Sequence, residues 1–72
     1  MPRLPALTSR EIIRVLERAG FFFRRQKGSH QIFVKDYRRV TVPYHNKDVR
    51  VGTLRHIIKQ SGLTTQQFLD LL

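Results

Sequence analysis

The sequence predicts an α+β fold in which a helix, a three-stranded antiparallel sheet and a second helix follow one another, with a short third helix at the C-terminus. Three observations predict it: an apolar stripe at helical spacing, three strand-like segments separated by short polar turns, and a second helical stripe. A chain of 72 residues cannot be divided into two units that each bury a core, so we expect one domain over residues 1–72. Both long helices are expected to pack on one face of the sheet.

The first helix is predicted over residues 9–19. Thr8 and Glu11 have the spacing of a capping box, in which each side chain accepts a hydrogen bond from the other residue's backbone amide. Gly20 can adopt the left-handed conformation that ends a helix. The apolar stripe between them consists of Ile12, Val15, Leu16 and Ala19.

The strands and the later helices follow from changes in the hydrophobic period. Segments with the composition of strands lie at residues 21–26, 30–34 and 39–43. After a polar loop at 45–48, helical spacing returns over residues 53–60 and stops at Gly62. Thr64 and Gln67 then repeat the capping-box spacing and predict the short third helix.

The register of the first hairpin decides which residues face the helices. A two-residue turn at 27–28 would pair Phe23 with Ile32 and divide the apolar residues almost evenly between the two faces. A three-residue loop at 27–29 pairs Phe23 with Phe33 and gathers them on one face, so we prefer it. The core face is then Phe21, Phe23, Phe33, Val40 and Val42. The open face is Arg24, Gln26, His30, Ile32, Arg39 and Thr41.

The net charge narrows the function classes. Fourteen Lys and Arg against five Asp and Glu give a net charge of +9, which indicates a polyanionic partner such as a nucleic acid. Acidic proteins and phospholipid surfaces would satisfy the same charge. No apolar run approaches the ~20 residues that span a membrane, so no membrane-spanning segment is expected, and a membrane is not among the expected partners. Because the chain has no cysteine, we expect no disulfide or thiolate metal site and a cytoplasmic location.

The sharpest local signal is the run of Lys27, Gly28, Ser29 and His30. The glycine lets the backbone turn closely, Ser29 can hydrogen-bond an anion, and an imidazole that exchanges protons near neutral pH begins a strand. Cleavage of RNA needs little more, because the 2′-hydroxyl must lose a proton and the leaving 5′-oxygen must gain one. The alternative is a turn glycine beside a solvent-exposed strand histidine, and the motif alone leaves both open.

A second imidazole is available at His45. In the preferred register His30 pairs with Pro43, so a strand continued to His45 would bring the two rings about 7–8 Å apart. The alternative is a loop histidine without a role in catalysis. Since the three histidines are widely spaced and no carboxylate cluster lies beside them, we expect a metal-free mechanism and no cofactor.

Cations surround these histidines in the sequence. Three arginines recur at every fourth position of the first helix, where like charges repel and invite an anion. An ordinary solvated helix face is the alternative. The predicted RNA-binding residues are these three arginines, the cations of the sheet and the following loop, and the two turn residues before His30. The set is Arg24, Lys27, Gly28, Ser29, Arg39, Arg10, Arg14, Arg18 and Lys47.

The order and spacing of several segments resemble the HicA toxin family, the small mRNA interferases of type II toxin-antitoxin systems. The likeness is carried by the segments 10–13, 19–21, 26–30, 32–33, 40–45, 52–55 and 58–62. The resemblance implies a fold like a double-stranded-RNA-binding domain and metal-independent endoribonuclease activity on mRNA. It also implies that His30 is catalytic and that a HicB-type antitoxin inhibits the toxin. Gln31 stands where many members have a second histidine.

A rival hypothesis from another class is a non-catalytic double-stranded RNA-binding module, because the same order of elements can recognise duplex RNA by its shape. Under the toxin hypothesis, the antitoxin is expected to cover the open face around His30.

Overall fold

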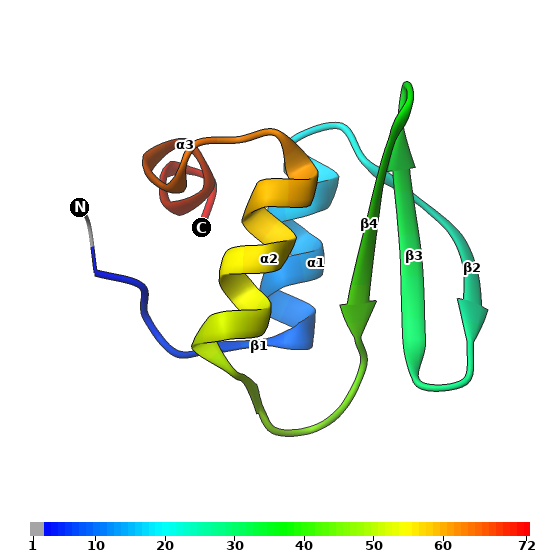
Figure 1. Ribbon diagram of the computed structural model, residues 1–72, viewed down its shortest axis with the longest axis horizontal. Coiled ribbons are helices and arrows are strands. Elements are labelled where there is room, and N and C mark those ends of the chain that lie inside the picture. Colours follow the sequence, from blue (N-terminus) through cyan, green and yellow to red (C-terminus); the bar gives the residue numbers. More distant parts are fainter. Residues whose placement is uncertain (1–2) are drawn as a thin grey trace.

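The computed structural model describes residues 3–72 and confirms the predicted order of elements. The helices are α1 (Ser9–Arg18), α2 (Val51–Ser61) and α3 (Thr65–Asp70). The main sheet has the order β2-β3-β4, with β2 (Phe22–Lys27), β3 (His30–Lys35) and β4 (Arg38–Pro43) all antiparallel. The helices lie on one side of this sheet, next to β4, and β2 is farthest from them (Figure 1). Within residues 3–72, no helix has the length and apolar character needed to cross a bilayer.

A second sheet of two very short strands was not predicted. β1 (Leu7–Thr8) pairs with β5 (Asp48–Val49), and the opposed Leu7 and Val49 are both buried. The predicted polar loop therefore ends in a strand, and α2 begins at Val51 instead of Thr53. Strands of two residues have no periodicity that a sequence pattern could reveal, and they form here because both apolar side chains close one end of the core.

The predicted helix ends are confirmed at three caps. The Thr8 hydroxyl accepts a hydrogen bond from the Glu11 amide, and the Glu11 carboxylate accepts one from the Thr8 amide at 3.0 Å. That bond from the Thr8 amide, followed by one from the Thr8 hydroxyl, lowers the pKa of Glu11. Thr64 and Gln67 form the same reciprocal pair at α3, and Gly62, at φ +76, ends α2. α1 ends one residue earlier than predicted, with Ala19 as its C-cap.

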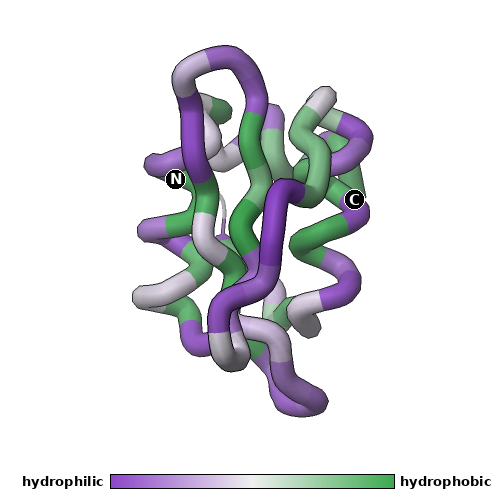
Figure 2. The backbone as a smooth tube through the Cα atoms, turned by 90° about the vertical axis from the view of Figure 1, so that its right-hand side faces the viewer, coloured by the Kyte–Doolittle hydropathy of each residue, from purple (hydrophilic) through white to green (hydrophobic). Residues whose placement is uncertain are grey.

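The core lies between the helices and the face of the sheet turned toward them. Its buried side chains are Ile12, Val15, Leu16, Phe21, Phe33, Val40, Val42, Leu54, Ile57, Ile58 and Phe68, together with Leu7 and Val49. Phe23 was predicted to belong to this core but is 50% exposed, although its ring still meets Phe33 edge to face. The reason is that β2 extends beyond the helices, so that all six of its residues are exposed. Seen from the β2 side, most of this strand is hydrophilic (Figure 2).

The pairing of Phe23 with Phe33 is confirmed, but the predicted three-residue loop is wrong. Lys27 pairs with His30, so the turn is only two residues long and begins with Gly28 at φ +59. A glycine in the left-handed region at the first central position is typical of a type II′ hairpin turn. The second hairpin has the predicted pairs: Phe33 with Val40, Gln31 with Val42, and His30 with Pro43.

A β-bulge reconciles the short turn with the predicted aromatic pair. The register shifts between Phe23 and Arg25, and in the described pairing Arg24 has no partner on β3. The bulge takes up the one residue that the shorter turn leaves over. As a result, Arg25 and Lys27, instead of Arg24 and Gln26, share the open face with His30.

Candidate functional site

His30 is the first residue of β3 and is exposed. Because Phe33 points into the core, the alternation of side chains along β3 places His30 on the opposite face, which the helices leave open. Its partner on β2 is Lys27. Opposed residues of antiparallel strands have Cβ atoms about 4.5–5.5 Å apart, and diagonal neighbours such as Arg25 lie about 7–8 Å away. The side chain of Lys27 therefore begins directly beside the imidazole of His30, and that of Arg25 begins one diagonal position away on the same face.

The turn before His30 is anchored to the third strand. The Tyr44 amide donates a hydrogen bond to the Ser29 carbonyl oxygen at 2.7 Å, which continues the ladder between β3 and β4 beyond Pro43. His30 thus begins a strand that has partners on both sides up to its first residue. A Cβ built on Gly28 would meet no atom of residues 3–72 within 4 Å. The backbone of His30 is therefore held between two strands, while the space around the adjacent turn is open to a ligand.

His45 lies elsewhere than along a continued strand. β4 ends at Pro43, so the condition for a close approach to His30 along β4 is not met. The buried Ser9 holds the chain at this point: its Oγ donates to the Pro43 carbonyl at 2.6 Å and accepts from the His45 amide at 3.3 Å. The exposed His45 borders a hollow of about 250 Å³ that is also lined by Thr8, Arg10, Tyr44 and Asn46. The fold therefore brings His45 beside Arg10 at the start of α1.

The three arginines of α1 have different surroundings. Arg10 lines the hollow with His45, and Arg14 is exposed. Arg18 is also exposed, but its Nη1 donates to the Leu71 carbonyl oxygen at 2.7 Å and ties α1 to the C-terminal end. The three arginines, which are evenly spaced in the sequence, therefore do not form one uniform surface. Arg10 borders a polar hollow, Arg14 faces solvent and Arg18 makes a structural contact.

The remaining predicted cations spread along the sheet and its rim. Arg39 pairs with Val34 on the open face, four strand positions from His30, which corresponds to about 13 Å. Arg24 is exposed in the bulge, and Lys47 is exposed in the loop before β5. In the part of the chain that the structure describes, no three His, Asp or Glu side chains cluster closely enough to hold a metal ion.

The sequence counts Arg25 among the basic residues of the sheet but predicts Arg24 and Gln26 for the open face in its place, and it does not single out Tyr44 or Asn46. The signal that could have found Arg25 is the Gly-Ser pair, since glycine at the first position of a two-residue turn would place Lys27 opposite His30. Arg25 then follows two residues earlier on the same face. The sequence gives no local signal that Tyr44 and Asn46 line a hollow, because the hollow forms only where their loop meets the start of α1.

These features define a class of small, strongly basic α+β proteins that present a histidine on an open three-stranded sheet. A family model described as "HicA toxin of bacterial toxin-antitoxin" matches residues 9–63, which run from the start of α1 past the end of α2. The chain belongs to this HicA toxin family. The family confirms the resemblance seen in the sequence, supports a toxin role and implies an antitoxin partner. No curated protein shows a significant match to the chain.

Proposed function

We propose that the chain is a metal-independent endoribonuclease, an mRNA interferase of the cytoplasm, with His30 as its catalytic residue. The observation that carries this proposal is the position of His30, which is exposed on a paired strand directly opposite Lys27. An imidazole held there can exchange a proton with bound RNA while the adjacent ammonium neutralises phosphate. Membership of a toxin family supports an activity that is harmful to the cell.

The proposed reaction is an internal transfer at phosphorus. The ribose 2′-oxygen bonds to the adjacent phosphorus while the bond from phosphorus to the 5′-oxygen breaks, which leaves a 2′,3′-cyclic phosphate and a 5′-hydroxyl. The 2′-hydroxyl gives up one proton and the 5′-oxygen gains one, and His30 performs one of these transfers as general base or general acid. Lys27 and Arg25 stabilise the negative charge that develops on the phosphoryl oxygens.

The proposal assigns the other proton transfer to His45. The support for this role is the polar hollow that His45 shares with Arg10, since β4 ends at Pro43 and a continued strand does not place His45 beside His30. A mechanism with two imidazoles predicts a bell-shaped dependence of cleavage rate on pH. His45→Ala is expected to remove one limb of that profile, and an unchanged profile would remove His45 from the mechanism.

RNA binding is proposed to follow the cations on both sides of the two histidines. On the sheet side the phosphate contacts come from Lys27, Arg39 and the bulged Arg24, with Gly28 and Ser29 at the turn. On the α1 side Arg10, Arg14 and Arg18 extend the positive potential, and Lys47 adds to it from the loop before β5. A HicB-type antitoxin inhibits by covering the open face around His30, because that face carries the proposed catalytic group and lies opposite the face that packs on the core.

The decisive experiment compares cleavage by the wild-type chain, His30→Ala and His56→Ala. His56 is a matched control, since it is an exposed histidine on α2, which packs against the other face of the sheet. We expect His30→Ala to lose cleavage with an unchanged circular-dichroism spectrum, and His56→Ala to retain it. Cleavage is expected to persist in EDTA and to yield the 2′,3′-cyclic phosphate.

Three results would contradict the proposal. Full activity of a folded His30→Ala variant would exclude the catalytic assignment. Loss of wild-type activity in EDTA would indicate a metal-dependent enzyme. RNA that stays intact with the folded wild-type chain, but is bound by it, would favour the non-catalytic RNA-binding module.

A further inference from the structure

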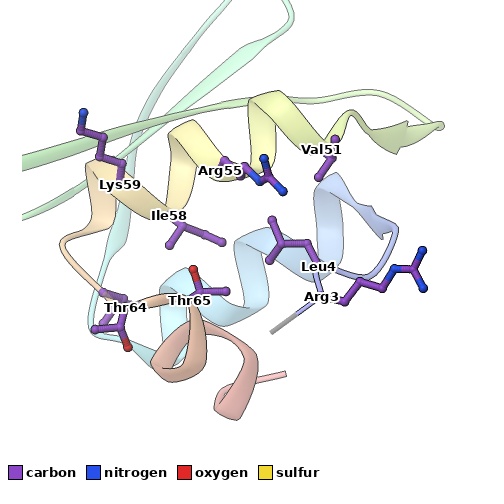
Figure 3. Close-up of a pocket in the computed structure, with 9 residues that line it drawn as sticks. Arg3, Leu4, Val51, Arg55, Ile58, Lys59, Thr64 and Thr65 are labelled. Carbon is purple, nitrogen blue, oxygen red and sulfur yellow. The ribbon is translucent and has the colours of Figure 1, made fainter. Parts of the chain in front are cut away.

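A groove lies away from His30, on the helix side of the molecule. It has a volume of about 860 Å³ and runs between α2, the segment that precedes β1 and the residues that lead into α3 (Figure 3). No residue of β2, β3 or β4 lines it, and the helices that border it lie on the other side of the sheet from the open face. The proposed cleavage reaction does not use this groove.

The floor of the groove is apolar. Leu4, Val51, Ile58 and Leu63 line it. Leu4 comes from the N-terminal segment and faces Ile58 of α2 across the groove (Figure 3). Val51 is 53% exposed although it opens a helix whose other apolar residues are buried. Exposed apolar surface that is gathered in a groove and bordered by polar residues is typical of a binding site.

The charged groups along the groove all have the same sign. Arg3, Arg55 and Lys59 line it, and none of the lining residues in the described chain carries a carboxylate. Arg55 and Lys59 are exposed and stand one helical turn apart on α2. An occupant that complements this surface has apolar side chains for the floor and negative charges for the rim.

Two properties of the groove favour a protein helix over RNA. Single-stranded RNA binds by stacking its bases on aromatic side chains, and no lining residue among those described is aromatic. From Val51 to Lys59 the groove follows α2 for about 12 Å, or roughly two helical turns. An amphipathic helix with apolar anchors one turn apart fits such a surface.

We propose that this groove docks an acidic amphipathic helix of the antitoxin. The inference rests on the proposed function, in which an antitoxin inhibits the chain by covering His30. The groove supplies a second anchor on the opposite side of the molecule. In this proposal one antitoxin contacts both the open face around His30 and the groove beside α2. Linking two contacts in this way raises the overall affinity above that of either contact alone.

The test measures the affinity of the chain for a HicB-type antitoxin by titration calorimetry, in a His30→Ala background that is expected to lack toxicity. Arg55→Glu tests the charged rim, and the uncharged Val51→Asn tests the apolar floor at a side chain that is already half exposed. Arg50→Glu is the matched control, since it reverses one exposed charge beside α2 but outside the groove. We expect the two groove variants to weaken binding at least about tenfold, and the control by less than about threefold.

Each other outcome overturns the inference in a distinct way. If the His30→Ala chain with an unchanged groove binds the antitoxin and both groove variants bind it with equal affinity, the groove is not the second anchor. The cleavage proposal is then unaffected. If only Val51→Asn weakens binding, the occupant is not acidic, and if only Arg55→Glu does so, the occupant is not amphipathic. If the antitoxin does not bind the wild-type surface at all, the proposed partner itself is wrong. In the chain that retains His30, Arg55→Glu is expected to cleave RNA at the wild-type rate, and a lower rate would assign the groove to RNA.

Discussion

Ser9→Ala is expected to destabilise the fold far more than its small change in size would suggest. Ser9 is the first residue of α1 and is 1% exposed, and its Oγ bridges the last residue of β4 and the segment that follows it. It donates to the Pro43 carbonyl oxygen at 2.6 Å and accepts from the His45 amide at 3.3 Å. Alanine removes the oxygen and leaves both partners without their hydrogen bonds in a partly buried place.

The expected loss follows from the cost of unpaired buried polar groups, which is about 1–3 kcal/mol. A domain of this size has only ~3–5 kcal/mol of net stability from its core, so the substitution is expected to remove a large part of the free energy of unfolding. For a domain of this length each kcal/mol shifts Tm by about 4–8 °C, so Tm should fall by at least about 4 °C.

Thermal unfolding followed by circular dichroism measures this shift, with Ser29→Ala as the control. Ser29 is an exposed serine of the β2–β3 turn, and its substitution is expected to change stability by no more than about 0.5 kcal/mol. Equal Tm values for the two variants would refute the argument that the bridge through Ser9 supports this part of the fold. In the proposed mechanism Ser9→Ala also lowers the cleavage rate at temperatures where it is folded, because His45 loses its attachment beside Arg10.

Three further predictions concern a helix end, an ionised cap and a phosphate contact. Gly62→Ala should cost about 1–3 kcal/mol in urea unfolding, because Gly62 has φ +76 and a Cβ would overlap the guanidinium of Arg38, and Arg38→Ala should recover part of that loss. The pKa of Glu11 is lower in the folded than in the unfolded chain, so its carboxylate stabilises the fold above its ordinary pKa, and this contribution disappears as pH falls through the lowered value. The Tm difference between the wild type and Glu11→Gln should therefore shrink in acid, and a constant difference would contradict the assignment. In a His30→Ala background, Lys27→Gln should weaken RNA binding and reduce the slope of log affinity against log salt by about 0.7–0.9, whereas an unchanged slope would show that Lys27 contacts no phosphate.

The helix caps were readable from the sequence because they depend on residues three positions apart. Thr8 with Glu11, and Thr64 with Gln67, satisfy their own backbone amides wherever the helices are placed in the fold. The apolar stripes behind them were readable for the same reason. His30 also followed from local sequence, because the turn glycine and the strand that it begins lie within a few residues of each other.

The neighbours of His30 were less readable, because they depend on a compromise between two parts of one hairpin. Gly28 favours a two-residue turn, while Phe23 and Phe33 favour an aromatic pair that such a turn would put out of register. The chain satisfies both with a bulge at Arg24, and the positions of the cations on the open face follow from it. A pattern of alternating residues cannot show where a bulge will form.

By itself, the sequence determined the order of the main helices and strands, the N-caps of α1 and α3, the glycine that ends α2, the strong positive charge and the histidine at the start of β3. Only the tertiary structure decided that His45 lies beside Arg10, that Leu7 pairs with Val49, and that Leu4 and Ile58 face each other across a groove. The physical reason is the range of the interactions. Caps and hydrophobic periods act within one element, whereas these contacts join segments tens of residues apart, whose meeting depends on how the whole core packs.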